Sequence, residues 1–151
     1  GTGDSQIEGE LFEMKKRHAN LSVNILFSNK AAHLIEAGSD FFLMPSRYEP
    51  CGLNQLYSLR YGTIPIAHRT GGLADTIIDV DEYPNKGTGL LFDELTPGEI
   101  RKHISRAVEL YNRKEGSGCM ERIRRRAMEQ DFSWNASASE YIDLYERLLE
   151  D

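Results

Sequence analysis

Cysteine is scarce in this chain of 151 residues, which carries only Cys51 and Cys119. The two lie far apart, and neither stands in a CxxC pair or near a histidine at the spacing of a zinc site. The sequence therefore argues against a zinc centre, and no metal site is predicted. Free thiols in a reducing compartment are the expectation, although the sequence alone leaves a disulfide between the two open.

Long hydrophobic runs and an excess of positive charge are also lacking. No apolar stretch approaches the roughly 20 residues of a membrane-spanning helix, and the first residues show no signal-peptide pattern. The formal net charge is −6, whereas a nucleic-acid-binding domain needs a basic face. We therefore expect neither a membrane nor a nucleic acid as a partner.

What the chain does have is the composition of a soluble globular protein, with 40% hydrophobic and 28% charged residues. The length fits one domain of ordinary size, so residues 1–151 are predicted to form a single domain. The first residues are unusual, because "GTGD" at residues 1–4 is typical of a loop that follows a strand, and no strand precedes it. We expect the chain to be part of a longer protein in which earlier elements precede it.

Helical and strand patterns alternate along much of the chain. Short β-branched or aromatic runs predict strands at residues 23–27, 41–44, 64–68 and 89–92, and the strand at 41–44 is expected to be buried. Apolar residues at helical spacing, with cap and stop signals, predict helices at residues 6–19, 30–38 and 53–61, after the cap at Thr96, at about 119–130, and from Ser133 onward. This alternation predicts an α/β fold, a parallel sheet with helices on both faces, followed by a helical C-terminal tail.

Three segments of the helical part carry specific expectations. Thr96, Pro97 and Glu99 form a capping box with proline at the first helical position. The basic run at residues 122–128 is interpreted as a solvated helix face. The last helix is expected to turn its apolar residues toward a core; these are Tyr141, Leu144, Tyr145 and Leu148.

Two predicted strands end in unusual loops, at residues 45–53 and 68–76. In the first, Pro50 biases Glu49 toward extended backbone, so its carboxylate can project from the loop. Gly52 lets the backbone approach a ligand, and the following helix offers free N–H groups and its positive dipole end to an anion. A carboxylate for hydroxyl groups and a helix N-terminus for a phosphate are what a sugar diphosphate needs. Because ligands of parallel sheets bind beyond the carboxyl ends of strands, both loops are candidates.

Plainer interpretations stay open at these positions. Glu49 can serve only to cap a turn, and a Gly-Gly pair after a strand, as at residues 71–72, is a common turn. His68 ends a strand beside the second loop, where it could line the site. Cys51 has no evident partner base, so it is interpreted as a wall of the pocket and not as a nucleophile.

The stretch "PSRYEPCGLNQLYSLRYGTIPIAHRTGGLADTI" closely resembles the C-terminal domain of bacterial glycogen synthases and plant starch synthases. These are retaining glucosyltransferases of the GT-B architecture, and the likeness runs from "GTGD" to the "DFSWNASASEYIDLYERLL" tail. The resemblance implies a Rossmann-like, nucleotide-sugar-binding domain that is the later part of the C-terminal half of such an enzyme.

The resemblance also implies roles for single positions. Glu49 matches the donor-side glutamate that contacts the glucose hydroxyls, and is the catalytic candidate. Phe27 falls where family members place an aromatic residue against the adenine, and Asn54 stands where many members carry Thr or Ile. The residues expected to bind the donor are Phe27, Cys51, Gly52, Leu53, Asn54, Thr70, Gly71, Gly72 and Leu73.

Tyr57 indicates which branch of the family the chain resembles. Many retaining GT-B enzymes carry a second glutamate eight positions after the first, where this chain has Tyr57. The difference favours glycogen and starch synthases over sucrose-synthase-like or lipopolysaccharide-type transferases.

The activity implied by the resemblance is transfer of glucose from ADP-glucose to the non-reducing end of an α-1,4-glucan with retention, releasing ADP and using no cofactor. UDP-glucose is excluded by no residue here. The family's N-terminal acceptor domain, with its KxGGL loop and histidine, and its Arg/Lys pair for the diphosphate lie outside residues 1–151. The chain alone is therefore expected to be inactive. The compartment implied is the bacterial cytoplasm or, for a plant member, the plastid.

Two rival functions are weighed against this one. A non-catalytic nucleotide-binding or assembly module is the first. A phosphorylase-like reaction is the second and ranks lower, because no lysine stands in a context suited to holding pyridoxal phosphate.

Overall fold

The structure is a computed structural model that describes residues 2–113 and 118–150. Contacts divide the chain into two compact units, Gly1–Ile35 and Glu36–Asp151. The first unit opens with helix α1 (Ser5–Arg17), whose N-terminus is capped by Asp4. The Asp4 carboxylate accepts hydrogen bonds from the backbone N–H groups of Gln6 and Ile7 at 2.8 and 3.2 Å. This cap fixes the start of α1 within one residue of its predicted position.

The strand predicted at residues 23–27 is wrong. These residues are irregular and pair with no strand in the described part of the chain. Val23 is buried, whereas the ring of Phe27 is 85% exposed. A β-branched run becomes a strand only when a neighbouring strand satisfies its backbone groups, and no described segment does so for residues 23–27. The next helix, α2 (Asn29–Gly38), begins one residue before its predicted start.

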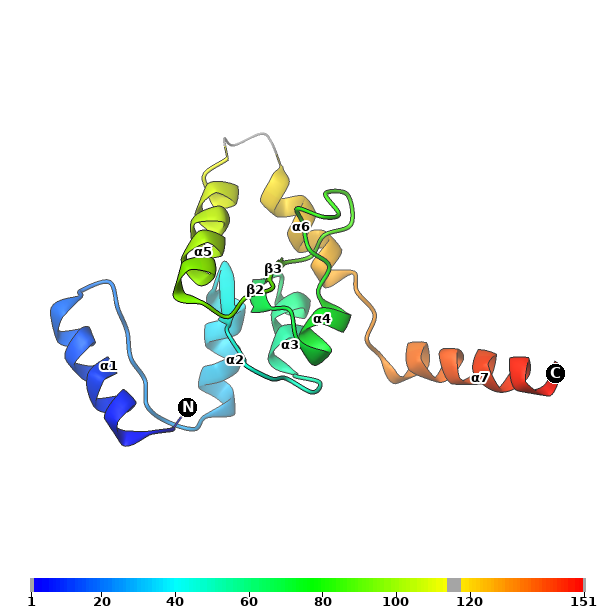
Figure 1. Cartoon of the computed structure of the whole chain (residues 1–151), viewed down its shortest axis with the longest axis horizontal. Coiled ribbons are helices and arrows are strands. Elements are labelled where there is room, and N and C mark those ends of the chain that lie inside the picture. Colours follow the sequence, from blue (N-terminus) through cyan, green and yellow to red (C-terminus); the bar gives the residue numbers. More distant parts are fainter. Residues whose placement is uncertain (1, 114–117, 151) are drawn as a thin grey trace. The chain divides into compact units, whose positions relative to one another are not determined.

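The second unit is built on a parallel sheet in the order β1-β2-β3. The strands are β1 (Phe41–Met44), β2 (Ile64–His68) and β3 (Leu90–Phe92). Met44 pairs with Ala67, and Ala67 pairs in turn with Leu91. The helices between and after the strands are α3 (Asn54–Tyr61), α4 (Gly71–Thr76), α5 (Pro97–Tyr111), α6 (Cys119–Met128) and α7 (Trp134–Glu150). Figure 1 shows α3 to α6 arranged around the short strands.

Alternate residues of the sheet enter two separate cores. Ile64, Ile66, Leu90 and Phe92 pack with residues of α5 and α6 on one face. Ala67 and Leu91 face the other way, and their cluster is completed by Met44, Leu73 and Ile77. Because strand side chains alternate between faces, helices must cover both sides. The predicted α/β fold with helices on both faces is confirmed.

Local signals set the ends of the helices in this unit. The Thr96 hydroxyl accepts a hydrogen bond from the Glu99 backbone N–H at 3.2 Å, and Pro97 is the first helical residue. Helix α3 ends at Gly62, which has the left-handed φ of 76° that glycine tolerates. The predicted cap at Thr96 and the predicted end of the helix at residue 61 are both confirmed.

Two burial expectations fail. Strand β1 is mostly half-exposed, with only Met44 buried, because it is the edge of the described sheet. On α7 the residues expected to face a core are instead between 48% and 65% exposed; these are Tyr141, Leu144, Tyr145 and Leu148. Helical periodicity creates an apolar face, but burial also requires a surface packed against it.

Candidate functional site

The two candidate loops leave the same edge of the sheet. Strands β1 and β2 are parallel and in register from Phe41–Ile64 to Met44–Ala67, so their carboxyl ends lie side by side. The chain after β1 forms the loop at residues 45–53, and the chain after β2 runs through Thr70 into α4. The topology thus places both loops where parallel sheets bind their ligands.

The loops touch directly through backbone atoms. The Gly72 N–H donates a hydrogen bond to the Glu49 carbonyl oxygen at 2.9 Å. A Cβ atom on Gly71 would lie 2.1 Å from that same oxygen, and one on Gly72 would lie 2.0 Å from the carbonyl oxygen of Cys51. No side chain fits at either position, so the glycine pair is what allows the loops to meet.

The Glu49 carboxylate is without a partner among the described residues. Glu49 is half-buried, and its side chain makes no hydrogen bond or ion pair with any residue whose position is described. It therefore caps no turn, which removes the plainer interpretation of this residue. An unpaired carboxylate on a turn held by its neighbours is free to accept hydrogen bonds from a ligand's hydroxyl groups.

Helix α3 begins five residues after Glu49, at Asn54, and its N-terminus is open. Its N-cap residue is Leu53, which has no side chain able to cap the helix and is 57% exposed. The first N–H groups of an α-helix have no partner within the helix, and here no cap side chain supplies one. The first turn thus offers donors and a positive dipole end to an anion.

Gln55 holds the turn in shape, and the sequence analysis did not single it out. Its side chain is fully buried, and Nε2 donates to the carbonyl oxygens of Cys51 and Gly52 at 2.7 and 3.1 Å. Nε2 also lies 3.4 Å from the Thr76 hydroxyl, so it joins the turn to the end of α4. The feature of the sequence that could have indicated this role is a polar residue in the first turn of a helix, four positions after Cys51.

Gly52 and Gln55 depend on each other. Gly52 has φ of 72°, and a Cβ there would lie 2.3 Å from Gln55 Oε1. That oxygen is itself buried, with no hydrogen-bond partner among the described residues. The turn thus requires glycine for conformation and for space.

The remaining predicted donor residues fall into two groups. Cys51 in the loop, Leu53 at the N-cap and Asn54 at the start of α3 are exposed. Thr70 is half-buried, and its hydroxyl makes no cap bond to α4. Leu73 is fully buried in the core beneath the sheet's second face. Its side chain holds α4 in place, so only its backbone is left for any ligand contact.

Phe27 belongs to the first unit of the chain. Its ring is 85% exposed on the irregular segment before α2. An exposed ring is suited to stacking on a base, and its role against adenine stays a prediction.

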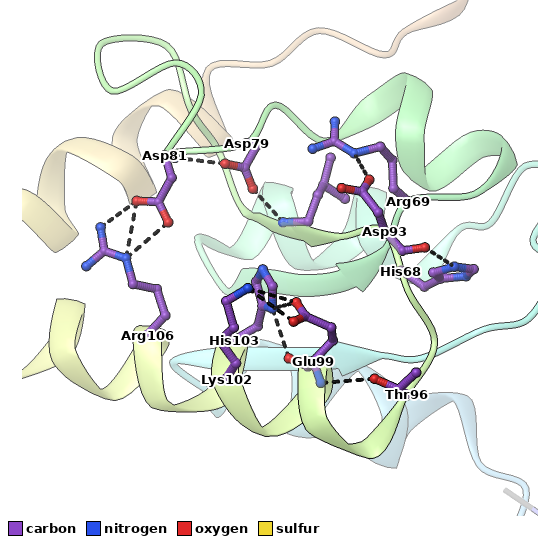
Figure 2. Close-up of polar contacts among 11 residues, drawn as sticks. His68, Arg69, Asp79, Asp81, Asp93, Thr96, Glu99, Lys102, His103 and Arg106 are labelled. Carbon is purple, nitrogen blue, oxygen red and sulfur yellow. Dashed lines mark hydrogen bonds and ion pairs between the residues drawn. The ribbon is translucent and has the colours of Figure 1, made fainter.

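Two residues at the end of β2, His68 and Arg69, make polar contacts with the neighbouring loops. His68 places Nδ1 2.7 Å from the Ser46 carbonyl oxygen and Nε2 3.3 Å from that of Asp93. Arg69 donates from Nε to Asp93 Oδ1 at 2.7 Å and also pairs with Glu82. Burial opposes the charge of Arg69, but the hydrogen bonds and charges of the two carboxylates outweigh it and raise its pKa. Figure 2 shows His68 and Arg69 with Asp93 between them, so the residue that follows β3 contacts the start of the second loop.

Metal and membrane features can be stated for the described residues only. Within residues 2–113 and 118–150, no group of three or more His, Cys, Asp or Glu side chains is placed to hold a metal ion. No helix in that part of the chain combines the length and the hydrophobicity that crossing a bilayer requires.

Comparison with known proteins places this geometry among glycosyltransferases. The family model described as glycosyl transferases group 1 matches residues 7–126. The glycogen synthase of Koribacter versatilis is 47% identical over 148 residues, which cover 97% of this chain and 30% of that protein. The glycogen synthase of Thioalkalivibrio sulfidiphilus is 44% identical over 153 residues, covering 99% of this chain and 31% of that protein. The chain thus spans about a third of the length of these relatives.

Solved structures share the fold. The catalytic domain of starch synthase IV from Arabidopsis thaliana, bound to ADP and acarbose, superposes with a TM-score of 0.79 at 34% identity, covering 97% of this chain and 30% of that one. Sucrose-phosphate synthase from Thermosynechococcus elongatus superposes with a TM-score of 0.64 at 24% identity, covering 99% and 37%. The second likeness concerns the fold alone, and both are consistent with a GT-B-like domain.

Proposed function

The chain belongs to the glycosyl transferases group 1 family, and from that premise we propose that it is the donor-binding part of a glycogen or starch synthase. The proposed reaction transfers glucose from ADP-glucose to the non-reducing 4-hydroxyl of an α-1,4-glucan with retention. The parts that hold the glucan acceptor are assigned to residues outside the 151 of this chain.

One observation carries the proposal: Glu49, whose carboxylate pairs with no described residue, stands in the loop that leads into the uncapped first turn of α3 and that Gly72 holds in place. The carboxylate would accept hydrogen bonds from the glucose hydroxyl groups. The N–H groups of the first turn, starting at Asn54, would face the diphosphate. The glucose and the diphosphate are two chemically different parts of a sugar nucleotide.

Charge explains why this arrangement favours transfer. When the glycosidic bond to the diphosphate breaks, negative charge grows on the leaving oxygen and positive charge on the sugar ring. Preorganised N–H donors stabilise the first charge, and a fixed carboxylate such as Glu49 stabilises the second. Gln55 keeps the turn rigid without touching the sugar, so its proposed role is positioning.

The donor is inferred from relatives. The structure of starch synthase IV holds ADP and acarbose, and the two relatives compared above are glycogen synthases. By similarity, the proposed donor here is ADP-glucose, and the exposed Phe27 is the proposed partner of its base.

The test is glucan extension from ADP-glucose by the full-length protein that contains this chain, with Glu49→Ala and Glu49→Gln. Removal of a group that acts in the transition state should lower kcat by about 10²-fold or more. Glu94→Gln is the matched control, because Glu94 is an exposed carboxylate outside both loops. Near-wild-type activity of Glu49→Ala would remove Glu49 from the mechanism. Binding of ADP without any glucan extension by the wild type would favour a non-catalytic nucleotide-binding module.

A further inference from the structure

A groove lined by arginines lies beside α6, away from the two loops. Its volume is about 580 Å³, and an adjoining hollow of about 230 Å³ shares part of its wall. The groove is lined by Pro84, Asn85, Arg113, Gly118, Cys119, Glu121, Arg122, Arg125 and Arg126. None of these residues belongs to the loops at 45–53 and 68–76, so the groove is separate from the proposed donor site.

The arginines converge for a structural reason. Arg122, Arg125 and Arg126 stand at helical spacing on α6 and share one face of it. Ile123 and Ala127 occupy the buried face, which fixes the rotation of the helix. Arg113 joins them just beyond the end of α5. In a chain of net charge −6, this is a local concentration of positive charge.

Two arginines near the groove, Arg124 and Arg106, differ from the groove arginines because each pairs with a carboxylate. Arg124 turns to another side of α6 and pairs with Asp40. Arg106, on the wall of the adjoining hollow, holds Asp81 with Nε 3.0 Å from Oδ2. Both have a carboxylate that neutralises them.

The groove arginines lack such partners. Among the described residues, no carboxylate forms an ion pair with Arg113, Arg122, Arg125 or Arg126. Arg126 donates to the Pro84 carbonyl oxygen at 2.8 Å, while its Nε is buried and makes no hydrogen bond in the described part of the chain. Glu121 is the one acidic residue among the lining side chains. Four arginines gathered with a single carboxylate among them leave an excess of positive charge, which favours an anion between them.

We propose that this groove binds a small phosphorylated anion through its phosphate or diphosphate group. A guanidinium group matches phosphate oxygens with two parallel N–H donors, which is why arginine recurs at phosphate sites. A volume of about 580 Å³ fits a small-molecule ligand. The basic run, interpreted from sequence as a solvated face, thereby becomes a second ligand site. This proposal does not depend on the proposed function.

The experiment is isothermal titration calorimetry of the full-length protein with inorganic pyrophosphate, in the wild type and in a groove variant. Substitutions in the groove leave the proposed donor site unaltered, so a change of affinity in the variant reports on the groove. The wild type should bind pyrophosphate, and the double variant Arg122→Gln/Arg125→Gln should lose affinity by about 10-fold or more, or about 1.4 kcal/mol. Both side chains are exposed, so the variant should keep the wild-type melting temperature.

The matched control is Arg101→Gln, an exposed arginine on α5 outside the groove. It should leave pyrophosphate affinity unchanged. The proposal is overturned if the wild type binds no pyrophosphate, if the control loses as much affinity as the double variant, or if only a polymeric anion such as heparin binds. The last result would mark a face for a polyanionic macromolecule and not a small-molecule site.

Discussion

At the scale of single residues, the candidate site depends on groups that carry no charge. Gly71 and Gly72 allow α4 to start against the backbone of residues 49–51, and Gln55 ties the carbonyl groups of the turn together from below. Glu49 is the side chain proposed to meet the sugar, yet its position is set by the Gly72 N–H bond to its carbonyl oxygen. The position of the Glu49 carboxylate therefore depends on the two glycines, because a side chain at Gly71 or Gly72 would push the loops apart.

Gly72→Ala tests this contact. The added Cβ would lie 2.0 Å from the Cys51 carbonyl oxygen, so the two loops must separate. Overpacking of this kind typically lowers the free energy of unfolding by about 1–3 kcal/mol, as measured by urea denaturation. Gly98→Ala is the control, because its nearest neighbour would be 3.8 Å away and the site is helical. It should be neutral or stabilising by up to about 1 kcal/mol. Equal stability of Gly72→Ala and wild type would contradict the close packing of the loops.

At the scale of elements, ion pairs connect the irregular segment before β3 to its neighbours. Asp79 is buried and accepts hydrogen bonds from the N–H groups of Asp81 and Leu91 at 2.8 and 2.6 Å. Arg106 of α5 holds Asp81, and Figure 2 shows this pair next to Asp79. The segment is thus tied to β3 and to α5, although its sequence has the composition of a loose loop.

The Asp81–Arg106 pair predicts a dependence of stability on pH. The hydrogen bond from Arg106 is the main cause that lowers the pKa of Asp81 in the folded protein. Because the pKa of Asp81 is lower in the folded protein than in the unfolded chain, the pair stabilises the fold fully at neutral pH. This stabilisation is lost as the pH falls below about 4 and passes through the pKa that Asp81 has in the folded protein. Because the Asp81 side chain is half-exposed, the contribution should be below about 1 kcal/mol.

The measurement is urea unfolding of Arg106→Gln and wild type at neutral and acidic pH. The difference in unfolding free energy should be present at neutral pH and shrink in acid. Arg101→Gln, on the same helix but exposed, should follow the wild type at both values. A difference that stays constant with pH would show that Arg106 stabilises α5 by packing and not through Asp81.

At the scale of the whole molecule, the described part of the chain combines a well-packed sheet region with an exposed apolar helix and an arginine-lined groove. The sheet and helices α3 to α6 enclose two cores. Apolar side chains remain exposed on α7, and the arginine groove lies on α6. The candidate donor loops belong to the well-packed part, between Met44 and Leu73. A ligand bound there should therefore stabilise the fold and not merely a local segment.

Thermal unfolding with ADP checks this expectation. A ligand that binds only the folded protein adds about 2.7 kcal/mol at a concentration of ~100 times its Kd. The melting temperature of the wild type should therefore rise with ADP, measured by scanning calorimetry. Gly72→Ala should show a smaller rise, because its loops are displaced. Gly98→Ala should match the wild type. A wild-type melting temperature insensitive to ADP would speak against a donor site formed by these loops.

The sequence by itself determined the features that depend on near neighbours along the chain. Caps and stops such as Thr96 and Gly62 placed the helix ends within a residue or two, because capping is a bond between positions two to four apart. Hydrophobic runs gave β2 and β3, and the long motif around Glu49 indicated the family before any geometry was known.

Only the tertiary structure decided the features that join distant positions. The bond from Gly72 to Glu49, the link from Gln55 to Thr76 and the gathering of Arg113 with Arg122 depend on how the elements pack. The same reason explains the errors: residues 23–27 lacked a pairing strand in the described residues, and the apolar face of α7 lacked a covering surface. Local sequence sets which conformations are favourable, whereas burial and pairing require a second segment whose position no local pattern encodes.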